Sequence, residues 1–183
     1  MRAAHEGADL NLDANPDPWL EGLPPVVGPD TRLVVLGSFP GAASLAAGQY
    51  YAHPRNRFWP LMGVLCGIDT TLPYPDRVRA LNARGVGVWD VYAQCEREGS
   101  LDSAIRAAQL NDFPALLQRC TRLNTIVHNG GESFRHAKVV EKSLAQAGLA
   151  GQVTVHRLPS TSPANASWTF EQKLTAWRAV LNP

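Results

Sequence analysis

The chain has 183 residues, a length that suits one compact domain with a sizeable core and argues against two domains. Hydrophobic residues make up 45% of the chain and charged residues 18%, a composition that excludes a disordered protein. The formal net charge of +1 excludes a uniformly basic nucleic-acid binder, so any phosphate contact has to come from local side chains or backbone N–H groups.

The first 30 residues contain five prolines and are predicted to form an irregular leader, anchored by Trp19 and Leu20. Residues 31–183 are predicted to form the single domain. The leader has no apolar core typical of a secretory signal, and no run reaches the ~18 apolar residues that a membrane span needs. We therefore expect a cytoplasmic protein without a membrane anchor.

After the leader, short apolar runs typical of buried strands alternate with stretches of helical periodicity. In chain order, the pattern predicts a strand at 32–36, helices at 56–67 and 76–84, a strand at 86–92, a helix at 112–120, a strand at 125–128, a helix at 132–147, a strand at 152–158 and a helix at 169–181. Four strands separated by helices predict a three-layer α/β/α fold around a mainly parallel four-stranded sheet.

Ligands of such sheets bind beyond the carboxyl ends of the strands. Here the segments that follow those ends are 37–41, 90–92, 129–131 and 159–165. They hold most of the chemically interesting side chains, so the sequence predicts a site built from several loops.

The densest of these regions follows the first strand. It begins with Gly-Ser-Phe-Pro-Gly at 37–41 and continues with Tyr-Tyr-Ala-His-Pro-Arg-Asn-Arg-Phe-Trp at 50–59. Aromatic faces can stack on a nucleobase, and the Asn56 carboxamide offers a donor and an acceptor to a base edge. The alternative use of Asn56 is to cap the helix that follows it.

The cysteines and histidines do not form a metal site by spacing. Cys66, Cys95 and Cys120 are odd in number and far apart, which argues against a disulfide framework and against an iron–sulfur or zinc centre. His53, His128 and His156 show no ligand spacing either. We expect no metal and no cofactor.

Three ordered strings make the chain resemble a known family. They are Gly-Ser-Phe-Pro-Gly at 37–41, the run at 50–59 and Leu-Pro-Ser-Thr-Ser-Pro-Ala-Asn at 158–165, with shorter matches at 88–91, 97–102 and 111–113. The set resembles the hypoxanthine-DNA glycosylases, also called DNA-deoxyinosine glycosylases, a branch of the uracil-DNA glycosylase superfamily. The resemblance runs from about Arg32 to the C-terminus. It implies a monomeric base-excision repair enzyme that acts on DNA containing deaminated bases and hydrolyses the N-glycosidic bond.

The resemblance also assigns roles to single residues. It gives the catalytic role to Asn56 and a base contact to Asn129. Segment 37–41 matches the first motif, which lines the base pocket. In many relatives this motif carries a carboxylate or carboxamide that positions water, whereas this chain has Ser38 or Phe39 at that place. Segment 159–165 resembles the second motif, a loop that enters the minor groove.

Physical chemistry suggests how these residues would act. Cleavage of the bond leaves positive charge on the sugar and negative charge on the base, so fixed donors aimed at the base favour the transition state. We expect Asn56 to hold the water and Asn129 to bond the base edge. The backbone of Gly37 and Ser38 would donate N–H groups. Stacking faces would come from Phe39 or Tyr51.

DNA contact is expected to be local and independent of base sequence. The candidates lie in or beside the late loop: His156, Ser160, Thr161, Ser162 and Asn165. Among the acidic residues, Asp90 and Asp112 are interpreted first as turn or cap residues and second as indirect contributors to catalysis, and Asp102 has no assigned role.

Three alternatives stay open. The enzyme could act mainly on uracil or on several deaminated bases, because pocket size and a few hydrogen bonds set that choice. It could be a nucleic-acid-binding module without catalysis, given the altered first motif. A nucleotide-binding α/β protein is the weakest alternative, since the chain lacks GxGxxG and a phosphate-loop Lys-Ser/Thr pair.

Overall fold

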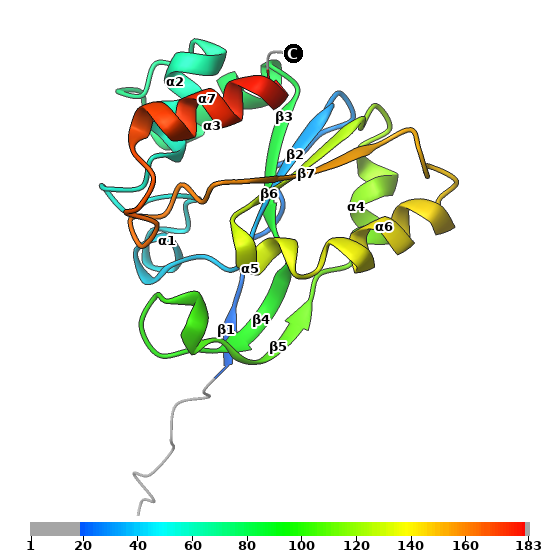
Figure 1. The fold of residues 1–183 in the computed structure, drawn as a ribbon, viewed down its shortest axis with the longest axis horizontal. Helices are drawn as coiled ribbons and strands as arrows, with labels where there is room; N and C mark the ends of the chain where they lie inside the picture. Colours follow the sequence, from blue (N-terminus) through cyan, green and yellow to red (C-terminus); the bar gives the residue numbers. More distant parts are fainter. Residues whose placement is uncertain (1–18, 182–183) are drawn as a thin grey trace, which may run out of the picture.

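The computed structural model describes residues 19–181 and confirms the predicted three-layer α/β/α fold (Figure 1). Its central sheet has four strands, β2 (Leu33–Gly37), β3 (Val86–Asp90), β6 (Thr125–Asn129) and β7 (Thr154–Leu158). Their order is β3-β2-β6-β7 and every pair is parallel. All four carboxyl ends therefore meet at one edge of the sheet.

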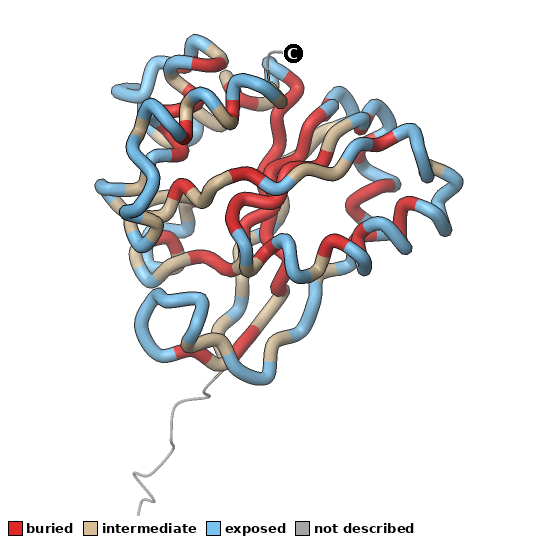
Figure 2. The backbone as a smooth tube through the Cα atoms, in the orientation of Figure 1, coloured by how far each residue is buried: buried red, intermediate tan, exposed pale blue. Residues whose placement is uncertain are grey.

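Strands β2 and β3 are buried along their whole length, because helices cover both faces of the sheet. Their sequences are therefore apolar rather than alternating, except that β3 ends in the buried Asp90. Figure 2 shows the buried residues concentrated along these strands. The β2–β3 register pairs Gly37 with Asp90, so the last residues of the two strands lie side by side.

Five helices form the outer layers. In Figure 1, α2 (Phe58–Cys66), α3 (Tyr74–Ala83) and α7 (Phe170–Leu181) cover one face, and α4 (Phe113–Arg119) and α6 (Ala137–Gln146) cover the other. Helix α2 packs against α7, and α4 packs against α6. Asp112 caps α4 by accepting a hydrogen bond from the Ala115 amide at 3.0 Å, which confirms its interpretation as a cap.

A second sheet, which the sequence did not predict, lies beyond the carboxyl edge of the first (Figure 1). It is antiparallel, with the order β1-β4-β5, and consists of β1 (Trp19–Glu21), β4 (Tyr92–Glu96) and β5 (Arg106–Leu110). The predicted strand at 86–92 was therefore wrong at its end: the chain leaves the main sheet after Asp90 and starts β4 at Tyr92.

The predicted leader is only partly within the described residues, since residues 1–18 lie outside them. In the described part, Trp19–Glu21 forms β1 and pairs with β4, so this part is not irregular throughout. Val26 forms an isolated bridge with Val88. The division into a leader at 1–30 and a domain at 31–183 stays a prediction.

The predicted helix at 132–147 is two helices, α5 (Gly131–Phe134) and α6. The break has a physical cause. In α5, the Ser133 hydroxyl donates to the Leu36 carbonyl at 2.8 Å and also bonds the His128 Nδ1 at 2.7 Å. These bonds hold α5 against the sheet while α6 turns away to pack on α4. Another short helix, α1 (Ala42–Ala47), follows the first motif and was not predicted.

Candidate active site

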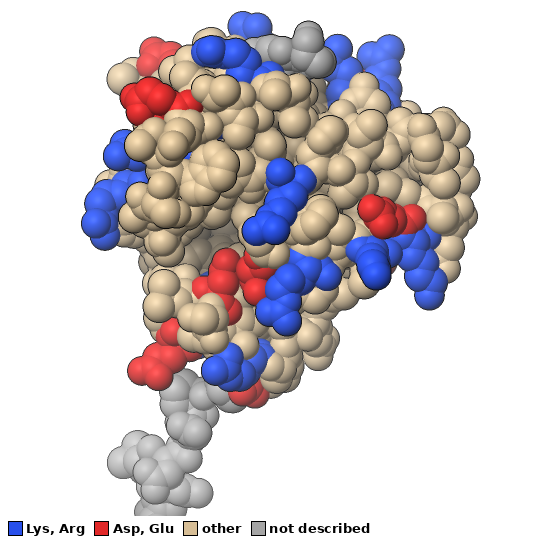
Figure 3. Space-filling view, viewed as in Figure 1, with Lys and Arg blue, Asp and Glu red and all other residues tan. Residues whose placement is uncertain are grey.

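A cavity of about 740 Å³ lies at the carboxyl ends of the central strands. It is large enough for a purine base, since small-molecule sites commonly have ~300–1,000 Å³. Segments from all four loops that were expected to carry the site line it: 37–44, Asp90, 129–131 and 157–165, together with Tyr51, Asn56 and 100–103. The face shown in Figure 3 is hollowed, and it carries acidic and basic side chains interspersed rather than a continuous basic surface.

The cavity brings together all but one of the predicted site residues. Those that line it are Asn56, Gly37, Ser38, Phe39, Tyr51, Asn129, Ser160, Thr161, Ser162 and Asn165. The exception is His156, which lies within β7 opposite Val127 and is not part of the lining. Its contact with DNA stays a prediction that the cavity does not support.

Asn56 is half-buried and lies two residues before the start of α2, since Arg57 is the N-cap. Its Oδ1 accepts a hydrogen bond from the Phe58 amide at 3.0 Å, so Asn56 bonds the first amide of the helix from one position outside the predicted cap. The bond fixes the plane of the carboxamide. Among the described residues, the Asn56 Nδ2 has no hydrogen-bond partner, which leaves its two donors for a molecule in the cavity.

The Asn129 carboxamide is already occupied within the protein. Its Oδ1 accepts from the Thr161 amide at 2.9 Å, and its Nδ2 donates to the Thr161 Oγ1 at 3.0 Å and to the Tyr51 hydroxyl at 3.3 Å. Both Nδ2 hydrogens are therefore engaged. Asn129 ties the tip of β6 to the late loop and to Tyr51, and it retains a single free lone pair on Oδ1.

Tyr51 is held in an unusual conformation. Its φ of 57° is left-handed, which costs free energy for a residue with a side chain. Its ring stacks on Phe58 with centroids 4.0 Å apart and an angle of 22°. Burial, with the nearby Asp90 adding a smaller effect, raises the pKa of the Tyr51 hydroxyl, so the phenol stays neutral at physiological pH.

The loop after β7, residues 159–165, is fixed from several sides. Trp177 donates from Nε1 to the Pro159 carbonyl at 3.0 Å, and Lys173 donates from Nζ to the Asn165 carbonyl at 3.0 Å. The Arg57 amide donates to the Thr161 carbonyl at 2.9 Å. Together with the Asn129 bonds, these contacts fix the conformation of 159–165. We call this segment, with the side chains that bond it, the loop wall.

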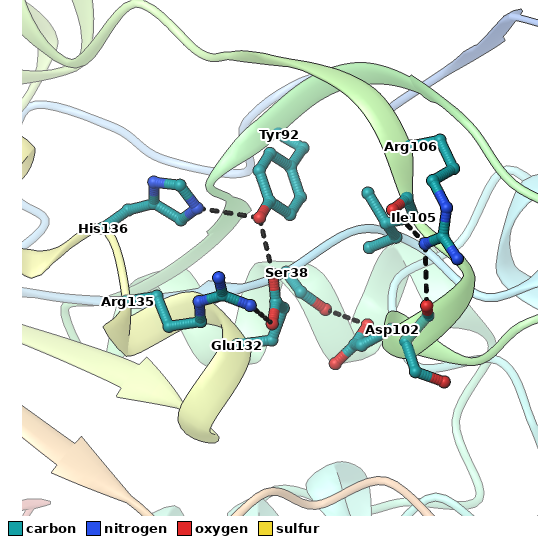
Figure 4. A network of polar contacts seen from close by, with 9 residues as sticks. Ser38, Tyr92, Asp102, Ile105, Arg106, Glu132, Arg135 and His136 are labelled. Carbon is teal, nitrogen blue, oxygen red and sulfur yellow. Dashed lines mark hydrogen bonds and ion pairs between the residues drawn. The ribbon is translucent and has the colours of Figure 1, made fainter.

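The opposite side of the cavity is formed by 37–41 and Asp90, and is called the motif wall below. The Ser38 hydroxyl donates to the Asp102 Oδ1 at 2.6 Å (Figure 4). The buried Arg97 guanidinium donates to the Pro40 carbonyl at 2.6 Å and lies over the Phe39 ring, 5.0 Å from its centroid. No role was expected for Asp102 or Arg97, although both lie in the 97–102 string of the family resemblance.

Asp90 is the least expected member of the motif wall. It ends β3, lines the cavity and exposes only 4% of its surface. Its Oδ2 is buried and has no hydrogen-bond partner among the described residues. Burial raises the pKa of this carboxyl to about 8, with the charge of Asp102 adding to the shift and that of Arg97 opposing it. A turn or cap role does not account for these properties.

The histidines have different surroundings. His53 lines the cavity, and its Nδ1 accepts from the Arg55 amide at 3.1 Å. His128 is fully buried outside the cavity, where burial lowers its pKa to about 4 and Ser133 bonds its Nδ1. His128 therefore joins β6 to α5.

A separate polar network lies beside the cavity (Figure 4). The Tyr92 hydroxyl donates to the Glu132 Oε1 at 2.7 Å, and the His136 Nε2 lies 2.7 Å from the Tyr92 hydroxyl oxygen. Glu132 also pairs with Arg135 at 3.1 Å. This network joins β4 to α5 and so braces the segment that carries Gly131 at the cavity edge.

Two features are absent from the residues that the structure describes. Within 19–181, no three His, Cys, Asp or Glu side chains come close enough to hold a metal ion. None of the helices in the same range has the length and apolar character needed to cross a bilayer.

Comparison with known proteins decides the family. The sequence profile described as Uracil DNA glycosylase superfamily matches residues 24–181, which is most of the chain. The chain belongs to the uracil DNA glycosylase superfamily. This confirms the superfamily expected from the three strings at 37–41, 50–59 and 158–165.

Two curated relatives within this superfamily carry the name Hypoxanthine DNA glycosylase. The protein from Methanosarcina acetivorans is 34% identical over 160 residues, which cover 87% of this chain and 96% of the relative. The protein from Methanosarcina barkeri is 36% identical over 121 residues, which cover 66% of this chain and 77% of the relative.

A solved structure agrees with the fold. The solution NMR structure of a candidate uracil DNA glycosylase from Methanosarcina acetivorans superposes with a TM-score of 0.76 at 31% sequence identity. The match covers 89% of this chain and 96% of that one. The similarity therefore extends over most of both chains.

Proposed function

We propose that this chain is a monofunctional DNA glycosylase that extrudes a deaminated base, hypoxanthine first among them, and hydrolyses its N-glycosidic bond to leave an abasic site. One observation carries the proposal: Asn56 and Asn129, 73 positions apart, line one cavity of purine size at the strand ends. Two Methanosarcina relatives named Hypoxanthine DNA glycosylase support the choice of base.

Asn56 is the proposed catalytic residue. Its Oδ1 is bound to the Phe58 amide, so its Nδ2 hydrogens can orient a water or bond the base edge without reorganisation. An amide cannot act as a general base, and its contribution is therefore positional and electrostatic. The Gly37 and Ser38 backbone would add N–H donors at the same wall.

Stacking and loop contacts complete the proposal. Phe58 covers one face of the Tyr51 ring, and Phe39 lies along the motif wall, so both rings are supported for contact with a base. Because Asn129 is already bonded to Thr161 and Tyr51, its main proposed role is to position these two residues. A direct bond from Asn129 to the base stays a prediction.

DNA is the proposed partner, held by the loop wall through Ser160, Thr161, Ser162, Asn165 and backbone groups. Arg157 lines the cavity and offers a positive charge to a phosphate. We further propose a monomeric, cytoplasmic enzyme, supported by the enclosure of a single base in one chain's cavity and by three free cysteines typical of a reducing compartment.

An excision panel tests this function. Duplexes with a single hypoxanthine, uracil or xanthine, and the matching single strands, are incubated with excess protein and then treated with alkali to cut abasic sites. We expect cleavage of the hypoxanthine duplex above the others. Product mainly from uracil would favour the uracil-type alternative, and binding without product would favour a non-catalytic module.

A further inference from the structure

The motif wall contains a carboxyl group that the mechanism described so far does not use. Asp90 lines the cavity, yet it exposes 4% of its surface and its Oδ2 lacks a partner among residues 19–181. Buried polar atoms are normally paired, and an unpaired one costs free energy. A group kept at that cost beside the proposed reaction centre calls for a functional explanation.

The chain makes room for this carboxyl. Gly37 lies opposite Asp90 in the β2–β3 register, and a Cβ added at Gly37 would lie 2.2 Å from the Asp90 Oδ1. Any other residue at position 37 would therefore push the carboxyl out of its place. The same Cβ would lie 3.6 Å from the Tyr51 hydroxyl, so the carboxyl and the phenol share this end of the cavity.

The charged and titratable groups around Asp90 leave it protonated near neutral pH. Arg97 favours the ionised form, whereas Asp102 opposes it. Tyr50 and Tyr51 also interact with Asp90, and both phenols stay neutral because burial raises their pKa values. Arg97 forms no ion pair with Asp90, since its described bonds go to the Pro40 and Gly99 carbonyls. Burial is the largest effect and keeps the proton on the carboxyl.

We propose that Asp90 is the acid of the reaction: a neutral carboxyl that donates its proton to the departing base. The inference rests on the proposed function and extends it, because the Asn56 amide and the backbone N–H groups can bond the base but have no proton to transfer to it. An anionic Asp90 would repel that charge, whereas a neutral one stabilises it.

In the proposed step, the bond from the sugar carbon to the base nitrogen breaks, and its electron pair goes to the base. The Asp90 proton moves to the base, which leaves as a neutral molecule. A water oxygen forms the new bond to the sugar carbon and releases a proton, which restores the neutral carboxyl. The products are the free base and an abasic sugar.

Single-turnover excision on the hypoxanthine duplex between pH 5.5 and pH 10 tests this role. The variants are Asp90→Asn, which keeps the shape and a donor but holds no transferable proton, and Asp90→Ala. Asp112→Asn, a change of another Asp at the α4 cap, is the matched control. We expect the wild-type and control rates to fall about tenfold per unit above about pH 8.

Asp90→Asn should be at least ~10-fold slower than wild type at pH 7 and should lose the alkaline decline, with Asp90→Ala ~100-fold slower. An Asp90→Asn rate within threefold of wild type, or an alkaline decline that persists in this variant, overturns the proposal. So does a wild-type rate that rises with pH between 5.5 and 7, since the active carboxyl would then be ionised. If Asp90→Ala does not fold, the rate and the pH profile of Asp90→Asn test the acid role on their own.

Failure of this inference and failure of the proposed function give different results. A wild-type protein that leaves hypoxanthine, uracil and xanthine duplexes intact removes the proposed function itself. An active wild-type protein whose Asp90→Asn variant keeps its rate and pH profile removes only the acid role. A carboxyl ¹³C titration of Asp90 in the intact protein reports the proton directly: a midpoint near 8 supports the role and a midpoint below 5 overturns it.

Discussion

The two walls of the cavity differ in how well their polar groups are paired. The loop wall is closely bonded: Asn129 alone makes three hydrogen bonds, and Lys173 and Trp177 hold the backbone on either side. In the motif wall, the Asp90 Oδ2 is buried without a partner among the described residues, and so is the Nη1 of Arg97, which bonds this wall at the Pro40 carbonyl. The two walls meet at the same cavity, so the difference is not one of location.

This contrast suggests that the loop wall fixes the geometry of the cavity, whereas the motif wall holds the group proposed to react. Paired groups stabilise the fold and fix geometry, whereas unpaired buried groups lower stability and persist where function needs them. Substitutions should therefore have opposite effects in the two walls: loss of stability in the loop wall, and gain of stability with loss of activity in the motif wall.

The largest expected effect is on the pH dependence of stability at Asp90. In the unfolded chain this carboxyl has its ordinary pKa of 3.8, whereas burial in the folded chain raises the pKa to about 8. The folded state therefore binds more protons, and wild type loses about 1.4 kcal/mol of unfolding free energy per pH unit between these values. In urea titrations, Asp90→Asn should lack this loss, so its advantage over wild type grows from pH 4 to pH 8 and then levels off. Parallel curves for the two proteins would contradict the motif-wall account.

Replacing the proposed catalytic amide comes next. Asn56→Ala should lose at least ~100-fold in single-turnover excision, by analogy with removal of one preorganised donor. Loss of the bond to the Phe58 amide should cost about 1 kcal/mol of stability, comparable to a lost cap. Asn56→Asp keeps an acceptor for that amide and serves as the control for the cap. A folded Asn56→Ala protein within tenfold of the wild-type rate removes Asn56 from the mechanism.

In the loop wall, Asn129→Ala should lower the free energy of unfolding by about 2 kcal/mol, because it leaves the buried Thr161 amide without its acceptor. Thermal denaturation measures the change. Thr161→Val removes only the hydroxyl and should cost less. An Asn129→Ala protein as stable as wild type would show that the loop is not held by these bonds.

The smallest expected effect concerns an aromatic side chain at the rim. Trp168 lines the cavity with 44% of its surface exposed, so it can contact DNA without supporting the core. Trp168→Ala should weaken binding to a deoxyinosine duplex by roughly 1 kcal/mol, about fivefold, and leave the melting temperature unchanged. Fluorescence anisotropy at a stated salt concentration measures the affinity, and unchanged binding would place Trp168 outside the interface.

The sequence predicted the central sheet because its strands are short, apolar and separated by helices. It missed β4, which is buried or half-buried but contains the polar Gln94 and Glu96, and β5, which is mostly exposed and has no apolar alternation. The break between α5 and α6 depends on Ser133 bonding Leu36, a contact 97 residues distant in sequence that no local pattern reveals.

The sequence predicted which residues line the site, but not the hydrogen bonds between them. The positions of the strand ends and the family resemblance predicted that Asn56 and Asn129 share one site, and both line the cavity. The hydrogen bonds between Asn129 and Thr161 were not predictable, because Thr161 lies on a loop 32 residues further along the chain. Asp90 was placed at a strand end and interpreted as a turn residue, because its burial depends on Gly37 in the neighbouring strand.

The most direct test of the central claim is the detection of the released base. Wild-type protein is mixed in excess with a duplex that holds one deoxyinosine, and free hypoxanthine is quantified by mass spectrometry beside the abasic strand. The account predicts one free hypoxanthine for each abasic site formed. Intact DNA, or strand cleavage without free base, would contradict it.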